Sequence, residues 1–262
     1  MPWITLAGCN IGDREEQQDR YLIEHSNDDQ SHLLVVADGA GGHKTGGLAA
    51  QAAIDCVREN LANLWSNDAP EMFLNRLISD CNKRVLAVGG GELACTTLVL
   101  ALIRGDEVFW AHVGDSRFYL IRDRHVIVRT NDHSVIELQR RQAAQNSRVS
   151  TTQSNELYMC LGALAKTAPD VSSSLVRDGD TLLLCSDGLW GQIDMKPIVA
   201  DLSERPLTLD RLNNWITKAK VAKHNNSDNI TLLAARLKSK PGFFPNPSKA
   251  IINFFKNDKS IN

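Results

Sequence analysis

Residues 35–46 read VVADGAGGHKTG, and this stretch decides how the rest of the chain is interpreted. The apolar run 33–37 predicts a buried strand that ends abruptly at Asp38. A carboxylate at the end of a rigid strand is well placed for chemistry, and the glycines after it let the backbone turn tightly and expose its carbonyls. The alternative is an ordinary glycine-rich turn. Phosphate-binding loops are excluded by spacing, since a Walker loop needs glycine at His43 and a dinucleotide fingerprint needs glycine at Lys44.

The composition is that of an ordinary globular protein. The 262 residues carry a net charge of -2, with 43% hydrophobic and 23% charged side chains. These values allow a sizeable core and give no basic field that would attract nucleic acid. No apolar run approaches the roughly 20 residues that span a bilayer, and the first residues show no secretory signal. We therefore expect no nucleic-acid partner, no membrane span and a location in the cytoplasm.

Six cysteines are spread along the chain without a C-x-x-C pair. Most of them lie within apolar patterns, which predicts buried, reduced thiols rather than a disulfide framework. They are Cys9, Cys56, Cys81, Cys95, Cys160 and Cys185.

Hydrophobic periodicity predicts strands interrupted by helices. Strands are expected at 3–11, 21–23, 33–37, 96–103, 108–113, 118–121, 125–129, 181–185 and 230–237. Helices are expected at 47–64, 69–87, 134–144, 192–202 and 207–223. Turn residues at 104–107 and 122–124 predict two hairpins, which favours antiparallel sheets. The polar segment 145–156 has no clear period and predicts a mobile loop.

The composition changes after Lys238. Residues 1–238 are expected to form one domain, and residues 239–262 a C-terminal linker and tail. A short apolar patch at 251–255 is expected to pack on the domain or to fray, and weak contact with a partner or a membrane surface is the alternative.

Four aspartates share one context, because each stands beside a predicted strand. They are Asp38, Asp115, Asp187 and Asp228. If those strands lie side by side, the carboxylates converge at one end of a sheet, and a bound divalent cation relieves their repulsion. All-oxygen ligation suits Mg²⁺ or Mn²⁺, and no Cys/His spacing indicates zinc. The alternative is that each aspartate caps its own turn.

The order of the motifs resembles that of the metal-dependent protein phosphatases, the type 2C serine/threonine phosphatases, and of their compact bacterial members in particular. The matching pieces cover about residues 5–237 and occur in the family's order. They are Gly12-x-Arg14, Gln18-Asp19, Asp38-Gly39-x-Gly41-Gly42-His43, Thr96-Thr97, Val113-Gly114-Asp115-Ser116-Arg117, Asp132-His133-Ser134, Leu161-Gly162, Ser186-Asp187-Gly188-Leu189-Trp190 and Asp228-Asn229.

The resemblance implies an α+β fold, a four-layer α-β-β-α sandwich with two antiparallel sheets face to face. It also implies a centre of two Mn²⁺ or Mg²⁺ ions. In that centre Asp38 would bridge both ions, the backbone carbonyl of Gly39 would bind one, and Asp187 and Asp228 would bind the other. Asp115, together with Asp187, is the candidate for a third ion.

Other roles carry over from the resemblance in the same way. Arg14 would bind the substrate phosphate as a bidentate fork, so Arg14 and Asp38 are the candidate catalytic residues. Asp19 would orient water or a metal ligand, and Thr97 and Asn229 would support the ligands from behind.

Three positions depart from the family's common pattern. Ala40 stands where animal and plant members often carry a histidine, a candidate general acid, so protonation of the leaving group is unassigned. Cys95 replaces the glycine that commonly precedes the threonine pair, which alters the packing there. Gly47 replaces a common glutamate.

The implied activity is hydrolysis of phosphoserine and phosphothreonine on proteins, by a water activated at the two-metal aspartate site. The protein would be a monomer that acts on phosphorylated proteins and reverses a Ser/Thr kinase pathway in the cytoplasm. Two alternatives stay open. One is a non-catalytic member that binds phosphoproteins, and the other is a partner-switching phosphatase that acts on an anti-sigma-type regulator.

Overall fold

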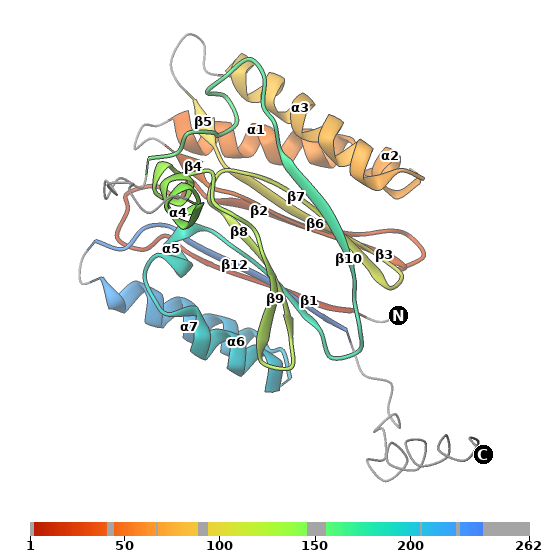
Figure 1. Ribbon diagram of the computed structural model, residues 1–262, viewed down its shortest axis with the longest axis vertical. Coiled ribbons are helices and arrows are strands. Elements are labelled where there is room, and N and C mark those ends of the chain that lie inside the picture. The colour runs from red at the N-terminus through yellow and green to blue at the C-terminus, as the bar shows by residue number, and fades with distance from the viewer. Residues whose placement is uncertain are drawn as a thin grey trace, which may run out of the picture.

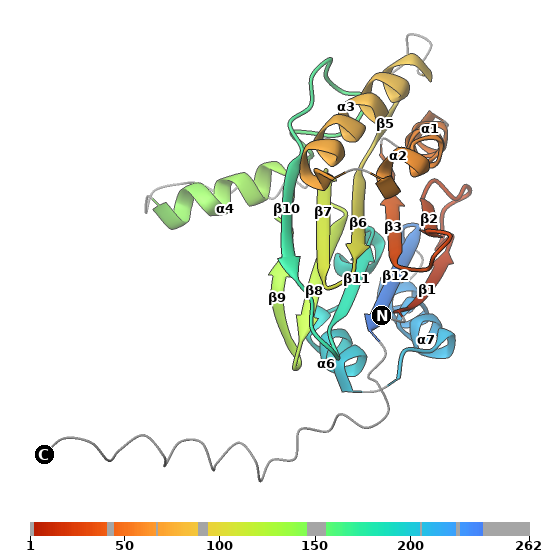
Figure 2. The ribbon, with the colours of Figure 1, turned by 90° about the vertical axis from the view of Figure 1, so that its right-hand side faces the viewer.

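Two five-stranded antiparallel sheets pack face to face, and helices cover the outer face of each sheet (Figures 1 and 2). This arrangement confirms the predicted four-layer α-β-β-α sandwich. The computed structural model describes residues 3–40, 45–66, 68–88, 94–145, 156–204, 206–223 and 226–237. The predicted loop 145–156 falls almost entirely outside the described residues, as does the predicted tail.

The strand order differs from the order along the chain. In the first sheet the order is β1 (Trp3–Asn10), β12 (Ile230–Leu237), β11 (Thr181–Cys185), β8 (Arg117–Arg122) and β9 (His125–Arg129). In the second sheet it is β10 (Asp170–Leu175), β7 (Glu107–Val113), β6 (Leu98–Arg104), β3 (Ser31–Ala37) and β2 (Arg20–His25). A two-residue strand β4 (Gly39–Ala40) pairs with β5 (Cys95–Thr96).

Three layers of apolar side chains hold the sandwich together. One lies between the sheets, and the other two lie between each sheet and its helices. The second sheet is covered by α1 (Thr45–Glu59), α2 (Leu61–Ser66) and α3 (Pro70–Val88). The first is covered by α5 (Asp187–Trp190), α6 (Met195–Glu204) and α7 (Leu209–Ala222). Helix α4 (Val135–Gln145) projects from the side of the sandwich (Figure 2).

Strand β3 shows why one segment can be apolar from end to end. Leu33 and Val35 pack into the layer beneath the helices, whereas Leu34 and Val36 pack between the sheets. Because both faces are covered, the sequence is a continuous apolar run instead of an alternating one. The strand is therefore rigid up to Asp38, which follows it directly.

Both predicted hairpins form. The β8–β9 turn places Asp123 and Arg124 at positive φ, 48° and 68°, the conformation of a two-residue turn whose twist matches that of the strands. In the β6–β7 turn Gly105 takes the positive φ, at 58°. In the described part of the chain, no helix is both long enough and apolar enough to cross a membrane.

Several predicted elements need correction. The helix expected at 47–64 is interrupted at Asn60, whose side-chain amide donates to the Cys56 carbonyl at 2.9 Å and takes the acceptor that a continuing helix would use. The helix expected at 192–202 runs from 195 to 204, and a separate one-turn helix precedes it. Strand β10 was not expected, because its serines at 172–174 give no apolar signal; pairing with β7 imposes it.

The cysteines are free, as expected, but they are not all buried. Cys9 on β1 is exposed, while the other five are buried. Cys9 lies near the end of β1, a strand in which most side chains are only partly buried.

Candidate active site

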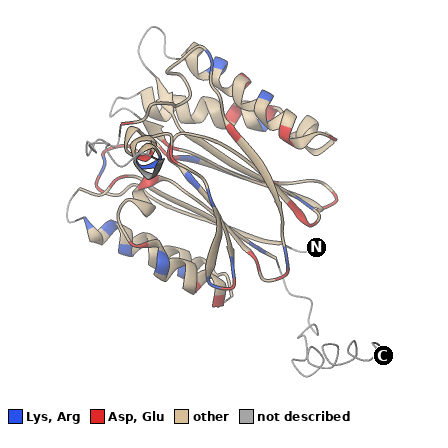
Figure 3. Ribbon diagram, in the orientation of Figure 1, with Lys and Arg blue, Asp and Glu red and all other residues tan. Residues whose placement is uncertain are grey.

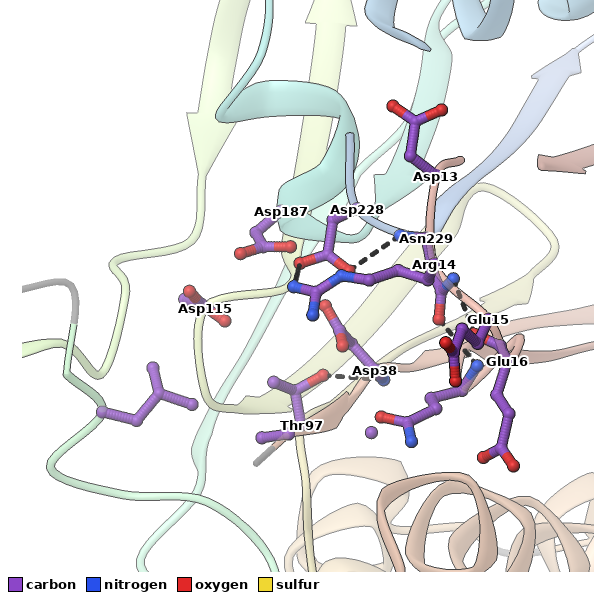
Figure 4. Close-up of a pocket in the computed structure, with 14 residues that line it drawn as sticks. Asp13, Arg14, Glu15, Glu16, Asp38, Thr97, Asp115, Asp187, Asp228 and Asn229 are labelled. Carbon is purple, nitrogen blue, oxygen red and sulfur yellow. Dashed lines mark hydrogen bonds and ion pairs between the residues drawn. The ribbon is translucent and has the colours of Figure 1, made fainter. Parts of the chain in front are cut away.

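The four aspartates predicted to converge line one cleft of about 610 Å³ (Figure 4). Asp38 follows β3, Asp115 lies between β7 and β8, Asp187 begins α5 after β11, and Asp228 lies just before β12. Because β12 runs antiparallel to β11, the start of β12 lies beside the end of β11 and brings two of these carboxylates together. The four aspartates therefore share one cleft, although Asp228 also caps its own turn by accepting the Asn229 N–H at 2.8 Å.

The backbone of Asp38 is fixed by Thr97. The Asp38 N–H donates to Thr97 Oγ1 at 3.0 Å, and the Thr97 N–H donates to the Asp38 carbonyl at 2.8 Å. Thr97 Oγ1 also lies 2.8 Å from Ser116 Oγ, next to Asp115. One threonine thus links the segments that carry two of the cleft carboxylates.

Three of the cleft aspartates, Asp38, Asp115 and Asp187, have raised pKa values. Withdrawal from water, followed by repulsion from Asp19 and Asp187, raises the pKa of Asp38 well above its ordinary value. Burial and then Asp187 raise the pKa of Asp115 to about 8. Burial and then Asp228 raise the pKa of Asp187 to about 6. Carboxyl groups this close cannot all be anionic unless positive charge joins them.

Asp19 lies beneath the cleft and does not line it. Its Oδ2 accepts a hydrogen bond from Ser186 Oγ at 2.8 Å, and its Oδ1 is buried without a hydrogen-bond partner. Burial raises the pKa of Asp19 to about 7, even though the nearby hydroxyl groups of Thr231 and Ser186 oppose the shift. The same Ser186 hydroxyl accepts the N–H of Thr231 at 3.0 Å, which ties β11 to β12 directly below the cleft.

Arg14 lines the same cleft, with half of its side chain exposed. Its Nη2 donates to Asp228 Oδ2 at 2.8 Å, and that hydrogen bond raises the pKa of Arg14 (Figure 4). Among the described residues that line the cleft, Arg14 is the one with a cationic side chain. One guanidinium offsets part of the charge that four carboxylates can carry.

Asn229 holds the loop that carries Arg14. Its Oδ1 accepts the N–H of Gln18 at 2.7 Å, and its Nδ2 donates to the carbonyls of Ile11 and Glu16 at 2.8 and 3.0 Å. The amide thus braces the loop from both ends and fixes where Arg14 begins.

Gly12 lets the Arg14 loop approach Asp228 closely. Its φ is +67°, and a Cβ at this position would lie 2.1 Å from the Asp228 carbonyl oxygen. A side chain here would be strained and would push the loop away. The adjacent Asp13 then accepts the N–H and the hydroxyl of Ser227, each at 3.0 Å.

The site residues predicted from the sequence line one cleft, with one exception. Asp19 is the exception, because it lies below the cleft; the residues that line it are Arg14, Asp38, Gly39, Thr97, Asp115, Asp187, Asp228 and Asn229. The hydroxyl groups of Ser116 and Ser186, which were not predicted as site residues, brace the site from behind. Both stand inside motifs quoted for the resemblance, beside Asp115 and Asp187, and that adjacency is the signal that could have found them.

The donor set fits hard divalent cations. Carboxylate and carbonyl oxygens are the ligands that Mg²⁺ and Mn²⁺ prefer, and the cleft presents several of them with raised pKa values. Cation binding would return these carboxyls to the ionised form that the cleft otherwise disfavours.

Comparison with known proteins gives a consistent result. The sequence profile of the protein phosphatase 2C family matches residues 10–225. The chain is 30% identical over 238 residues to the serine/threonine phosphatase stp of Listeria monocytogenes, covering 84% of this chain and 93% of that protein. It is 28% identical over 224 residues to the protein phosphatase PhpP of Streptococcus pneumoniae, covering 78% of this chain and 89% of that protein.

The fold comparison agrees with the sequence comparison. A solved structure of the catalytic domain of the serine/threonine protein phosphatase PstP, in complex with two manganese ions, superposes with a TM-score of 0.75. The two sequences are 25% identical, and the match covers 90% of this chain and 99% of that one. The motifs, the fold and the cleft lead to the same conclusion: the chain belongs to the protein phosphatase 2C family.

Proposed function

We propose that this chain hydrolyses phosphoserine and phosphothreonine on proteins at the cleft described above, with divalent cations held by the cleft aspartates. The observation that carries the proposal is the convergence of four carboxylates in one cleft in which Arg14 is the cationic partner among the described residues. The complete set of aspartates favours a catalytic member over one that only binds phosphoproteins.

The cations would be two Mn²⁺ or Mg²⁺ ions. Asp38 would be their shared ligand, with the Gly39 carbonyl on one ion and with Asp187 and Asp228 on the other. Asp115 and Asp187 would hold a third ion. When bound, the cations supply a water of lowered pKa as the nucleophile and positive charge against the phosphoryl oxygens.

Arg14 would grip the phosphate of the substrate. Its guanidinium is now hydrogen-bonded to Asp228 through Nη2, and its exposed side chain reaches the mouth of the cleft. A planar fork of N–H donors matches two phosphoryl oxygens at once and neutralises charge that grows in the transition state. The loop held by Asn229 would keep the fork in place, so that little freedom is lost when substrate binds.

The residues behind the cleft would keep the carboxylates in register. Thr97 fixes the main chain of Asp38 through two hydrogen bonds, so the bridging carboxylate has little room to move. Asp19, charged or neutral, would act through Ser186, which lies directly before Asp187.

The opposing kinase and the cellular compartment are also proposals. A phosphoprotein substrate requires a Ser/Thr kinase that forms it, and we infer that the protein reverses such a pathway. Free thiols support a reducing compartment, the cytoplasm. Lys and Arg lie beside Asp and Glu on the upper helices and the hairpins, and they outnumber Asp and Glu on α7 (Figure 3). The net charge of -2 gives no overall basic field that would argue for nucleic acid. The boundary at 238 and a monomeric state remain predictions, which limited proteolysis and light scattering would check.

Phosphate release from a phosphothreonine peptide tests the proposed function. We expect turnover with Mn²⁺ or Mg²⁺, its loss in EDTA and its return when excess Mn²⁺ is added. An exposed hairpin carboxylate gives a matched control, since Asp106→Asn should leave turnover unchanged. Full turnover in EDTA would overturn the mechanism. Binding of the peptide without turnover would favour the non-catalytic alternative.

A further inference from the structure

The one-turn helix α5 is linked to the cleft at both of its ends. Its first residue, Asp187, supplies a carboxylate to the cleft (Figure 4). Its last residue, Trp190, contacts the segment that carries Asp115. The Trp190 indole Nε1 donates to the Asp115 backbone carbonyl at 3.0 Å. A four-residue element therefore carries one of two neighbouring carboxylates and is hydrogen-bonded to the backbone of the other.

The indole itself is held from one face by Arg117. The guanidinium carbon of Arg117 lies 3.4 Å from the centroid of the Trp190 ring, a cation–π contact. Arg117 is in turn fixed by two hydrogen bonds to Asp132, of 2.7 Å from Nε and 2.6 Å from Nη2. The side chains of Arg117 and Asp132 are only 9% and 4% exposed, so water competes weakly for these contacts.

Other contacts fix the Asp115 segment to different parts of the fold. Gly114 has a φ of +102°, its N–H donates to His133 Nδ1 at 3.2 Å, and its carbonyl accepts the His133 N–H at 2.9 Å. Ser116 contacts Thr97, as described above. Among the hydrogen bonds between described residues, the bond from Trp190 is the one that joins this segment to the helix carrying Asp187.

The hydrogen bond from Trp190 matters because Asp115 and Asp187 repel each other. Asp115 is buried and Asp187 is partly buried beside it, and the two carboxylates repel when both are ionised. Without a fixed separation, the repulsion would be relieved by moving the two segments apart, and a cation would then have to draw them together again. A main chain already held at the right separation avoids that cost.

We propose that Trp190, clamped by Arg117, is a positioning residue that fixes Asp115 relative to Asp187 and thereby sets the affinity for the cation these two carboxylates share. This inference rests on the proposed function, because it presumes a cation centre in the cleft. Trp190 touches neither substrate nor reacting atoms in this role. It acts through the backbone of Asp115.

The test compares Trp190→Phe with Trp215→Phe. Phenylalanine keeps an aromatic face for Arg117 and removes the N–H. Trp215 is a matched control, because its indole also donates a hydrogen bond, to Asp201 Oδ2 at 2.9 Å, and also packs against a cation, Lys218. It lies on α7, away from the cleft. Mn²⁺ binding to each protein is measured by calorimetry and by the electron paramagnetic resonance signal of free Mn²⁺.

We expect Trp190→Phe to loosen the weakest Mn²⁺-binding step about fivefold while the tighter steps stay within about twofold. Trp215→Phe should leave every step within about twofold. A general loss of stability would move all steps together, so a change confined to one step separates positioning from structure. Identical binding in wild type and Trp190→Phe would overturn the inference, as would a wild-type protein that binds two ions and no third. A wild-type protein that binds no Mn²⁺ would instead overturn the proposed function.

A second measurement decides the question if Trp190→Phe does not fold. The wild-type chain has five tryptophans, and their indole N–H resonances can be followed after ¹⁵N labelling. One of them should shift during the weakest Mg²⁺-binding step, and the same resonance should be broadened by bound Mn²⁺. If no indole resonance responds to that step, the inference is wrong.

Discussion

Strand β11 has an aspartate near each end, and the fold treats the two in opposite ways. Asp180, directly before the strand, is 1% exposed and accepts two hydrogen bonds from Arg122, of 2.8 Å from Nε and 2.6 Å from Nη2. It also accepts the N–H of Arg177 at 2.8 Å. Asp187, beyond the other end, faces more carboxylates, and burial followed by Asp228 raises its pKa to about 6.

The difference separates a structural carboxylate from a functional one. A buried anion is tolerated when the chain supplies a cation in good geometry, and removing either partner then costs stability. Arg122 does this for Asp180, and Arg117 does it for Asp132 at the other end of β8. Where several carboxylates meet with too little positive charge, the fold is poised to take up cations from solution. Three substitutions and one pH dependence test this difference between structural and functional carboxylates.

The largest effect is expected from Asp38→Asn. This change removes the proposed bridging charge, so kcat should fall by about a thousandfold or more and Mn²⁺ binding should weaken. The stability of the chelated protein should hold or rise, because one repelling carboxylate is gone. Kinetics with a phosphothreonine peptide and thermal unfolding in EDTA measure the two effects. Turnover near the wild-type rate would show that the cleft is misassigned.

Asp180→Asn should lower the stability of the protein and leave its activity unchanged. It leaves the Arg122 side chain, which is 19% exposed, without its ion pair. Breaking a buried pair typically costs about 3–5 kcal/mol of unfolding free energy, and partial access of water to Arg122 places this change at or below the lower end, about 3 kcal/mol. Urea unfolding measures this cost, with Asp178→Asn as the control, since Asp178 is exposed in the same turn. Mn²⁺ affinity and kcat of the folded fraction should stay near wild type. A large change in Mn²⁺ affinity without loss of stability would erase the contrast.

Arg14→Ala should separate phosphate binding from metal binding. Loss of a charge-assisted bidentate contact is worth about 2–3 kcal/mol, roughly a hundredfold in kcat/KM. Much of this should lie in KM if the contact is equal in the ground and transition states. Arg14→Lys keeps the charge without the fork and should recover only part of the loss. Mn²⁺ affinity well below wild type would mean that Arg14 serves the metal centre instead.

The smallest effect is a slope of stability with pH in the chelated protein. Burial and Asp187 raise the pKa of Asp115 to about 8, whereas an aspartate in the unfolded chain titrates near about 3.9. Between those values the folded state holds a proton that the unfolded state lacks. This contribution is complete below about pH 4 and is lost, at about 1.4 kcal/mol per pH unit, as the pH rises toward 8.

Urea unfolding at pH 6, 7 and 8 measures that slope. Excess Mn²⁺ should flatten it, because a bound cation favours the ionised carboxylates. Asp115→Asn should lower the slope in EDTA, and Asp180→Asn should leave it unchanged. Equal slopes for wild type and Asp115→Asn would show that Asp115 does not hold the proton.

Local pattern predicted most of the elements but not their limits. Strand β3 and the two hairpins were predicted because apolar runs and turn residues act over a few positions. Strand β10 was missed because its pairing with β7 comes from a distant part of the chain. Leu48, although apolar, is 59% exposed, because the small residues Ala49, Ala52 and Ala53 form the packed face of α1.

The chemistry of the cleft could be predicted from the residues. Four aspartates beside predicted strands indicated oxygen ligands for Mg²⁺ or Mn²⁺, and the resemblance in motif order implied which of them would meet. Which charges are compensated depends on long-range contacts. Arg14 pairs with Asp228 across 214 positions and Arg122 with Asp180 across 58, and no local pattern encodes contacts of that range. The hydrogen bond from Trp190 to Asp115, 75 positions apart, was decided in the same way.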